Sequence, residues 1–258
     1  MFGILGFAIR TYNAAHRFFW PYSPPPADGV ELKEIEDRAA RMRTDISDHL
    51  ATIFCETLAV RPRLIVELGV REGESRFVLE RAAKLAGSFL LSVDINDCAS
   101  ACNQSASMHF VKADDVQFAG TFAHWCLQHG IAPEIDLLFI DTSHLYDHTL
   151  QEIRAWFPHL SPRCRVIFHD TNLRRFNRRR DGTIGGGWNN DRGVIRAIED
   201  HLGVRFNERS DFVTLAKEWA VRHWAHCNGL TILERLPQRM AGNNSFEHEV
   251  TAAPQAIG

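Results

Sequence analysis

The 258-residue sequence has no long uninterrupted apolar run, no Cys-x-x-Cys pair and no large excess of charge of one sign. Because a membrane-spanning helix needs about 20 mostly apolar residues, the first absence argues against a transmembrane segment. The six cysteines are scattered without a Cys-x-x-Cys pair, which indicates reduced thiols in a cytoplasmic protein. A net charge near −3 gives no general attraction to nucleic acid. The apolar fraction of 45% is sufficient for a buried core.

Residues 1–29 are an aromatic segment that leads into three consecutive prolines, Pro24-Pro25-Pro26, which cannot continue a helix. The order of its charges does not fit a signal peptide, which starts with basic residues and ends at small ones. Two interpretations remain open: an arm that packs on a partner subunit, which we favour, or a helix that rests on a membrane surface. We expect one globular domain over residues 30–237 and a disordered tail over residues 238–258, where periodicity is weak.

From residue 64 onwards, short apolar runs alternate with stretches of helical periodicity. Glu31–Leu58 precedes this region and also has the apolar spacing of a helix. Continuous apolar strands that alternate with helices predict a parallel sheet covered on both faces. We expect strands at Leu64–Leu68, Phe89–Val93, His109–Lys112, Ile135–Ile140 and Arg165–Phe168, and helices at Ser75–Leu85, Val116–His129, Tyr146–Phe157 and Arg192–Leu202. Short closing strands are expected at Val204–Arg209, Phe212–Ala216 and Leu230–Leu233, the last two as an antiparallel pair.

A glycine turn follows the first apolar strand. Gly69 and Gly73 allow the backbone to turn tightly and to approach a ligand, and Ser75 can cap the next helix. Asp94 ends the second strand, where a carboxylate can accept hydrogen bonds from both hydroxyls of a ribose. Asp114 follows the third strand, where it could meet the edge of an adenine ring. These residues would also suit a nicotinamide dinucleotide, but its Gly-x-Gly-x-x-Gly fingerprint is absent because an arginine stands at the second glycine position.

Two later apolar strands end in acids, Asp141 and Asp170. Neighbouring strands would bring the two carboxylates together, and a proton or a cation would relieve their repulsion in a half-buried site. Oxygen ligands favour Mg²⁺, Mn²⁺ or Ca²⁺. His144 lies three residues beyond Asp141 and can face the same cavity, where an imidazole suits a general base. The alternative is structural, with Asp141 as the cap of the following helix and His169 closing the edge of the sheet.

The block Val66-Glu67-Leu68-Gly69, together with Asp94, resembles the class I S-adenosylmethionine-dependent methyltransferases. The pattern Asp-x-Ser-His-x-Tyr over residues 141–146, followed by a helix and an apolar strand that ends in an acid, is similar to the metal-dependent O-methyltransferases of the cephalosporin-hydroxylase-like and macrocin-type sugar group. This resemblance implies an α/β fold with a doubly wound, mostly parallel, seven-stranded Rossmann-like sheet, helices on both faces and an N-terminal helical extension. It implies a site for S-adenosylmethionine formed by Glu67, Gly69, Gly73, Ser75, Asp94 and Asp114.

In the same group the two strand-end acids hold a divalent metal, so the resemblance implies Asp141 and Asp170 as ligands and His144 as the base that removes the acceptor proton. The residue before the later acid is often acidic in the group, whereas here it is His169, whose imidazole shifts the preference from Mg²⁺ towards softer ions. We expect Mg²⁺ first, with Mn²⁺ or another ion open, His169 as a third ligand and Asn172 as its substitute. The expected activity is metal-dependent O-methylation of a hydroxyl on a small molecule, such as a sugar or natural product.

The loop over residues 173–190 is rich in arginine and glycine and follows Asp170 closely, which suits a lid over the acceptor. Its arginines could hold an anionic acceptor, such as a phosphorylated or carboxylated sugar, or could form a solvated basic loop. Nucleic acid is disfavoured because the basic patch is local and has few aromatic residues. We interpret His223, His226 and Cys227 as structural.

Two other classes of protein stay open at this point. One is a nicotinamide-dependent oxidoreductase, and the other is a non-catalytic scaffold that binds S-adenosylmethionine. Members of the resembled group tend to oligomerise, so we also expect a homo-oligomer, for which the aromatic N-terminal arm would be suited.

Overall fold

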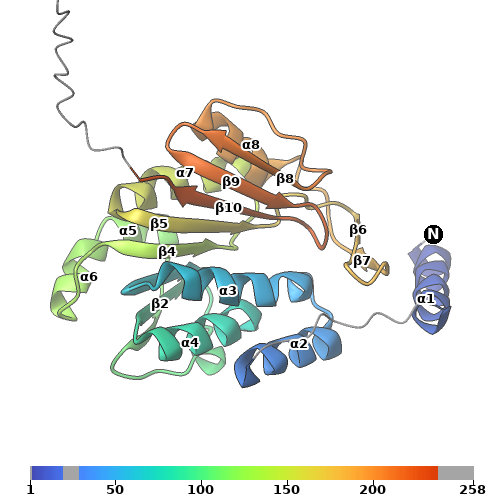
Figure 1. The fold of residues 1–258 in the computed structure, drawn as a ribbon, viewed down its shortest axis with the longest axis horizontal. Coiled ribbons are helices and arrows are strands. Elements are labelled where there is room, and N and C mark those ends of the chain that lie inside the picture. The colour runs from blue at the N-terminus through green and yellow to red at the C-terminus, as the bar shows by residue number, and fades with distance from the viewer. Residues whose placement is uncertain (1, 20–28, 238–258) are drawn as a thin grey trace, which may run out of the picture.

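An eight-stranded sheet forms the centre of the computed structural model, which describes residues 2–19 and 29–237 (Figure 1). The strand order is β3-β2-β1-β4-β5-β10-β9-β8, with β1 to β5 parallel to one another and β10, β9 and β8 joined by antiparallel pairing. The bounds are β1 Leu64–Leu68, β2 Phe89–Asp94, β3 Met108–Lys112, β4 Ile135–Ile140, β5 Leu160–His169, β8 Phe212–Ala216, β9 Trp219–Trp224 and β10 Leu230–Arg235. The tail expected over residues 238–258 lies outside the described residues.

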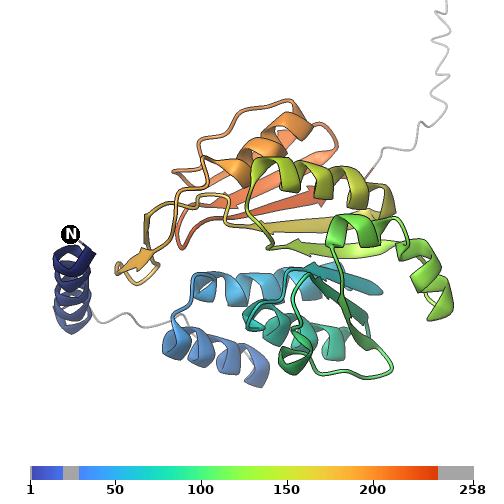
Figure 2. The same cartoon turned by 180° about the vertical axis from the view of Figure 1, so that it is seen from behind.

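Helices cover both faces of this sheet, as the apolar strands require. The near face in Figure 1 carries α2 (Val30–Met42), α3 (Leu50–Val60) and α4 (Glu74–Ala86). The opposite face, in front in Figure 2, carries α5 (Asp115–Ala119), α6 (Phe122–Gln128), α7 (Tyr146–Trp156) and α8 (Gly193–Leu202). Side chains of β4 alternate between the two cores, since Leu137 and Phe139 pack with the first set of helices and Leu138 and Ile140 with the second. The predicted doubly wound α/β class is confirmed.

The sheet has eight strands and not the seven that the resemblance implied, and β9 was not expected from the sequence. β9 buries Trp219, Val221 and His223 on one face while Arg222 on the other face reaches solvent-accessible acids. This alternation is typical of a strand, although no strand was expected over these residues. As a consequence, β8 and β10 are not paired with each other, and β9 lies between them.

The strand predicted over Val204–Arg209 is also absent. The backbone amide of Phe206 donates to the carboxylate of Glu199 at 2.7 Å, so it is not available for a strand ladder. Arg192 and Arg205 donate to the same carboxylate at 2.8 and 3.1 Å. This network fixes the turn after α8. The helix predicted over Val116–His129 is likewise divided into α5 and α6 by a turn around Gly120.

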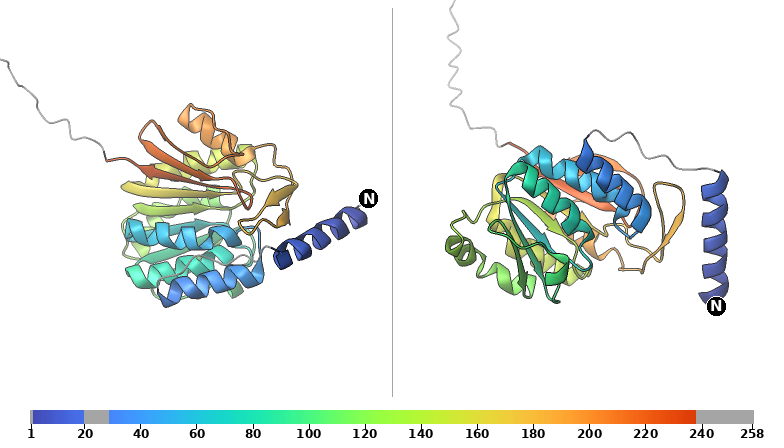
Figure 3. Two further views of the ribbon diagram at one scale, coloured as in Figure 1. Left: turned by 45° about the vertical axis from the view of Figure 1, so that its right-hand side comes forward. Right: turned by 90° about the horizontal axis from the view of Figure 1, so that it is seen from below.

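The predicted N-terminal helical extension is present as α1 (Phe2–Phe19), which stands outside the main body (Figure 3). It contacts a small hairpin inside the arginine-rich loop, formed by β6 (Phe176–Arg178) and β7 (Ile184–Gly186). Asn13 donates to the backbone oxygen of Ile184 at 2.9 Å and accepts from its amide at 2.8 Å. Within residues 2–19 and 29–237, no helix has the length and apolar character needed to cross a membrane.

Candidate active site

The carboxyl ends of β1, β4 and β5 lie side by side at the centre of the sheet, on either side of the point where the strand order reverses. Ligands of open α/β sheets bind at such a point. The loop after β1 passes very close to the loop after β4. A Cβ atom added to Gly69 would lie 2.1 Å from the backbone oxygen of Asp141, and Gly69 has a φ of +85°. Glycine is therefore required here both for its backbone conformation and for its size.

We expect Gly69→Ala to destabilise the protein by about 2–4 kcal/mol, because the added methyl group collides with backbone and the residue must keep a left-handed conformation. Gly87→Ala is the matched control: Gly87 has a φ of +66°, but nothing lies within 4 Å of its added Cβ. That variant should lose only about 1 kcal/mol, the cost of the left-handed conformation. Urea unfolding of both variants measures the difference, and equal losses would contradict the steric argument.

Three candidate metal ligands converge beyond the ends of β4 and β5. One side-chain atom of each of Asp141, His144 and Asp170 lies within 4.8 Å of the others. The Nδ1 atom of His144 is 2.9 Å from Asp170 Oδ2 and 3.7 Å from Asp141 Oδ1. The second carboxylate oxygen of Asp170, Oδ1, is buried without a hydrogen-bond partner among the described residues. A set of oxygen and imidazole donors with an unsatisfied buried oxygen fits a divalent cation.

His144 and Asp170 are held in unusual backbone conformations, with φ values of +60° and +56°. Left-handed conformations cost non-glycine residues on the order of 1–3 kcal/mol and are concentrated at functional sites. Asn190 supports both residues, since its Nδ2 donates to the backbone oxygen of His144 at 3.2 Å and to that of Asp170 at 3.4 Å. Asn190 is buried and comes from the end of the arginine-rich loop, and no pattern in the sequence pointed to it.

His169 lies next to the three-residue group but outside it. Its side chain is 1% exposed, and its Nδ1 is 3.2 Å from Asp141 Oδ1 and 3.5 Å from Asp170 Oδ1. Its other ring nitrogen, Nε2, is buried without a hydrogen-bond partner in the described part of the chain. The structural alternative for Asp141 is not supported, because α7 is preceded by Leu145 and has no side-chain cap.

The negative charges of Asp141 and Asp170 favour the protonated forms of the two neighbouring histidines. Burial by itself would lower the pKa of His169, but the carboxylates of Asp170 and Asp141 outweigh it and raise that pKa to about 10. For His144, burial lowers the pKa, but the hydrogen bond to Asp170 and the charges of the two acids outweigh burial, and the pKa is raised. Conversely, the pKa of Asp170 is lowered despite its burial, because His169 and His144 face it. Protonated imidazoles thus balance charge that a bound cation would also balance.

A cavity of about 470 Å³ opens beside the loops after β1, β2 and β4. Its wall includes four residues that the sequence singled out: Gly69, Asp94, Asp114 and Asp141. It also includes residues that were missed, among them Arg71, Ile95, Asn96, Asp115, Thr142, Ser143 and His148. The cavity is large enough for a cofactor and touches the metal-ligand group at Asp141.

Asp94 is fixed at the wall of this cavity by backbone amides. Its Oδ2 accepts from Val70 at 2.8 Å and from Arg71 at 3.2 Å, and its Oδ1 accepts from Asn96 at 2.8 Å. Burial opposes ionisation, yet these hydrogen bonds hold the pKa of Asp94 below its usual value. Asp94 is therefore an oriented carboxylate that faces a ligand-sized space. Asp114 is the N-cap of α5, where its side chain accepts from the amide of Gln117 at 2.9 Å.

Glu67, Gly73 and Ser75 are not part of the cavity wall. The side chain of Glu67 is completely buried and accepts hydrogen bonds from the hydroxyls of Ser75 and Ser92. Burial raises the pKa of Glu67 to about 7. The prediction that Ser75 caps the helix is wrong, because α4 begins at Glu74 with Gly73 as its N-cap. These residues join the first turn of α4 to β1 and β2 below the cavity.

A second group of possible ligand atoms, from Asp115, His148 and Glu152, adjoins the cavity. Thr142 donates to Glu152 at 2.6 Å, and His148 Nε2 lies 3.2 Å from Asp115 Oδ1. Burial raises the pKa of Glu152 well above its usual value. A protonated Glu152 can share its proton with Asp115, which explains the group without a metal ion.

The part of the chain that carries this site is similar in sequence to a known protein family. Residues 66–171, the region that runs from β1 to the residue after Asp170, match a sequence family described as a methyltransferase domain. Residues 66–171 are thus similar to a methyltransferase domain. The match confirms the resemblance drawn from the sequence and favours a methyltransferase over the nicotinamide-dependent alternative. Class I enzymes take the methyl group from S-adenosylmethionine, so the cavity beside Asp94 is the candidate site for that cofactor.

Solved structures share the fold of this methyltransferase domain. MycE from the mycinamycin biosynthetic pathway, solved with Mg, SAH and mycinamycin VI, is 16% identical with a TM-score of 0.50, over 84% of this chain and 57% of MycE. The O-methyltransferase TomG from Streptomyces achromogenes, involved in tomaymycin synthesis and solved with SAM, is 14% identical with a TM-score of 0.51, over 88% of this chain and 98% of TomG. An uncharacterized protein, y4gI of Sinorhizobium fredii, is 31% identical over 137 residues, which cover 45% of this chain but only 14% of that protein.

Proposed function

We propose that this methyltransferase is an S-adenosylmethionine-dependent and divalent-metal-dependent O-methyltransferase that acts on a hydroxyl group of a small molecule. The observation that carries the proposal is the convergence of Asp141, His144 and Asp170 at the edge of a cofactor-sized cavity. MycE, whose fold this chain shares, was solved with Mg and a small-molecule acceptor, which supports the same arrangement. A sugar or another natural product is the proposed acceptor class.

Each residue has a definite role in this proposal. Asp141 and Asp170 would hold the cation, and a bound divalent cation lowers the pKa of a hydroxyl group near it. His144 would accept the proton from the acceptor hydroxyl on its Nε2 atom, since its Nδ1 lies 2.9 Å from Asp170 Oδ2 and donates to that carboxylate. Asp94 orients the ribose of the cofactor. The loops after β1 and β4 line the cavity and would position the cofactor beside the acceptor, so positioning would supply much of the rate.

Metal removal tests the proposal directly. We expect EDTA followed by dialysis to lower the rate of S-adenosylhomocysteine formation at least about 100-fold, and Mg²⁺ or Mn²⁺ to restore it, because a metal contributes several kcal/mol to such a step. The assay supplies S-adenosylmethionine and a panel of hydroxylated sugars and natural products. Full activity in metal-free buffer would overturn the metal dependence and leave the methyltransferase assignment intact.

The scaffold alternative makes a different prediction. A non-catalytic protein would bind S-adenosylmethionine in the cavity, without any metal effect and without methyl transfer to any acceptor. The clustering of His144 with two acids favours the enzyme, because binding of the cofactor alone would not require that group. Homo-oligomer formation through α1 stays a prediction, which sedimentation of the full chain can measure.

A further inference from the structure

Two adjoining cavities lie beyond β5, on the chain segment that follows Asp170. Their volumes are about 400 and 480 Å³, and they share Asn172, Arg174 and Arg209 as a common wall. The first, here called the arginine cavity, is also lined by Phe176, Asn177, Arg178, Arg179, Asp211, Ala225 and His226. Neither cavity includes a residue of the cofactor site described above. Each is of a size that accepts a small molecule.

The arginine cavity has a strong excess of positive charge. Arg174, Arg178, Arg179 and Arg209 line it, against Asp211 as the single acid of its wall. Asp211 is already engaged, since it accepts from the amide of Ala225 at 2.7 Å. The chain as a whole carries a net charge of −3, so this concentration of arginines is local. Such a cavity attracts anions.

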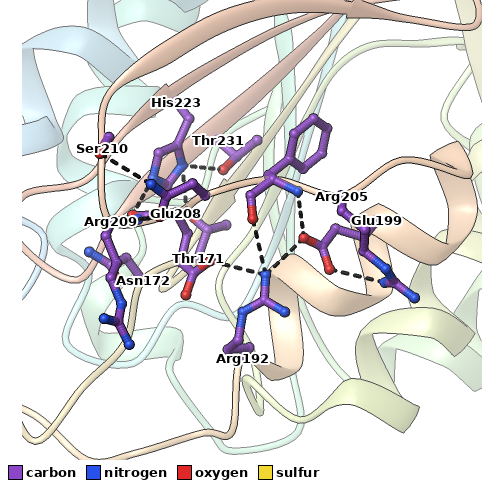
Figure 4. Close-up of polar contacts among 12 residues, drawn as sticks. Thr171, Asn172, Arg192, Glu199, Arg205, Glu208, Arg209, Ser210, His223 and Thr231 are labelled. Atoms are coloured by element: carbon purple, nitrogen blue, oxygen red, sulfur yellow. Dashed lines mark hydrogen bonds and ion pairs between the residues drawn. The ribbon is translucent and has the colours of Figure 1, made fainter.

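Most arginines of the loop over residues 173–190 have structural partners, but Arg178 of this loop and Arg209 outside it, both in the wall of the arginine cavity, do not. Arg180 pairs with Glu36 at 3.0 Å, and Arg179 donates to the backbone oxygen of Arg43 at 3.1 Å. By contrast, the guanidinium groups of Arg178 and Arg209 make no hydrogen bond or ion pair within residues 2–19 and 29–237. In Figure 4 the side chain of Arg209 extends beside Asn172 without a bonded partner at its end.

An unsatisfied donor also belongs to the wall of the arginine cavity. The Nε atom of Arg179 is buried and has no hydrogen-bond partner in the described residues. Guanidinium groups bind the oxygens of phosphoryl and carboxylate groups through paired hydrogen bonds. Arg178, Arg179 and Arg209 therefore offer free donors around one cavity, which favours an anionic ligand with several oxygens.

The arginine cavity is joined to the reaction site through packed groups. Arg174 donates from Nε to Asn172 at 3.0 Å, and Asn172 is two residues beyond Asp170. The ring of His226, in the cavity wall, lies 4.7 Å from the ring of His49, which lies 5.8 Å from the ring of His169. The arginine cavity therefore lies near the carboxyl end of β5, where Asp170 also lies, so an acceptor anchored there would be held near the two acids.

We propose that the arginine cavity binds a phosphoryl group of the hydroxyl acceptor, so that the enzyme methylates a phosphorylated small molecule. The inference rests on the proposed function, whose acceptor class it narrows. A phosphoryl group is favoured over a carboxylate because it carries about −1.5 to −2 charges at neutral pH and offers three acceptor oxygens, which match several free guanidinium donors.

The first test uses pyrophosphate as the probe, in calorimetric titrations of the full chain with EDTA present, so that the probe cannot bind through a cation. Wild-type protein should bind pyrophosphate, and Arg178→Gln and Arg209→Gln should each weaken binding about 10-fold or more, as expected for loss of a charge-assisted pair. Arg163→Gln is the matched control, since Arg163 is exposed at the beginning of β5 and away from the cavity. Equal weakening by all three variants, or no binding to wild type, would overturn the inference.

The second test separates this inference from the proposed function. With an acceptor identified, pyrophosphate should raise the KM for the acceptor in wild type but have little effect in Arg209→Gln. Methyl transfer to an uncharged or carboxylated acceptor, at a rate insensitive to pyrophosphate, would overturn the phosphoryl site and leave the O-methyltransferase intact. Pyrophosphate binding with the expected arginine dependence, but no methyl transfer to any hydroxylated acceptor, phosphorylated or not, would contradict the proposed function itself.

Discussion

Asp170→Asn should lower kcat at least about 1000-fold, because it removes one of the two carboxylates proposed to hold the cation, and metal ions contribute several kcal/mol to such reactions. Asparagine is the suitable replacement. Asp170 has a φ of +56°, and asparagine adopts the left-handed region more readily than alanine does. The side chain therefore loses its charge without forcing the backbone to rearrange. Asp141→Asn should have an effect of similar size.

Metal binding distinguishes this explanation from a folding defect. Calorimetry with Mn²⁺ should show loss of the site in Asp170→Asn, whereas binding of S-adenosylhomocysteine should change little, since Asp170 is not part of the cofactor cavity. Asp147→Asn, an exposed acid in the first turn of α7, is the control and should behave as wild type. Unchanged Mn²⁺ affinity in Asp170→Asn, with activity lost, would refute the ligand role.

The central part of the fold was predictable because its signals are local. β1 and β4 are buried on both faces, so every residue in them is apolar or satisfied internally, and such runs are visible in a sequence. The closing strands were harder. β9 includes Arg222 and His223, whose polar groups are satisfied by Glu56 and by the backbone oxygen of Glu208, both distant in the chain. Long-range partners of this kind leave no periodic signal.

The same distinction applies to the site. Asp141 and Asp170 could be predicted as neighbours from the sequence, because they follow adjacent parallel strands whose carboxyl ends lie together. Thr142 and His148 were missed as cavity residues, since their position depends on how α7 packs against α5. Asn190 was missed because it reaches the backbone of His144 from a loop 46 residues further along the chain. Position on an element could be predicted, whereas the convergence of separate loops could not.

The arrangement around His144 also explains why this residue, and not His169, is the proposed base. His169 has a side chain that is 1% exposed, below the acid pair, so an acceptor hydroxyl could not approach it. His144 is more open, with 17% of its side chain exposed, and its ring lies 6.1 Å from the ring of the exposed Trp188. Trp188 belongs to the arginine-rich loop, so an acceptor beneath that loop would meet His144 first.

His144→Asn should lower kcat by about 100- to 10,000-fold, the usual range for loss of a general base. His144 has a φ of +60°, so asparagine again keeps the backbone conformation that alanine would strain. The KM for S-adenosylmethionine should change little, because His144 is not in the wall of the cofactor cavity. His124→Asn, an exposed histidine on α6, serves as the control.

The pH profile and the metal affinity together identify what His144 does. Without a cation, burial lowers the pKa of His144 but the hydrogen bond to Asp170 and the charges of both acids raise it. A cation held by the two acids would offset their effect, so the metal-loaded rate should rise with pH through the ordinary histidine range, as the base loses its proton. That rise should disappear in His144→Asn, while Mn²⁺ affinity stays within a few-fold of wild type. If Mn²⁺ affinity instead falls as far as in Asp170→Asn, His144 is a metal ligand, and the proton must leave the acceptor by another route.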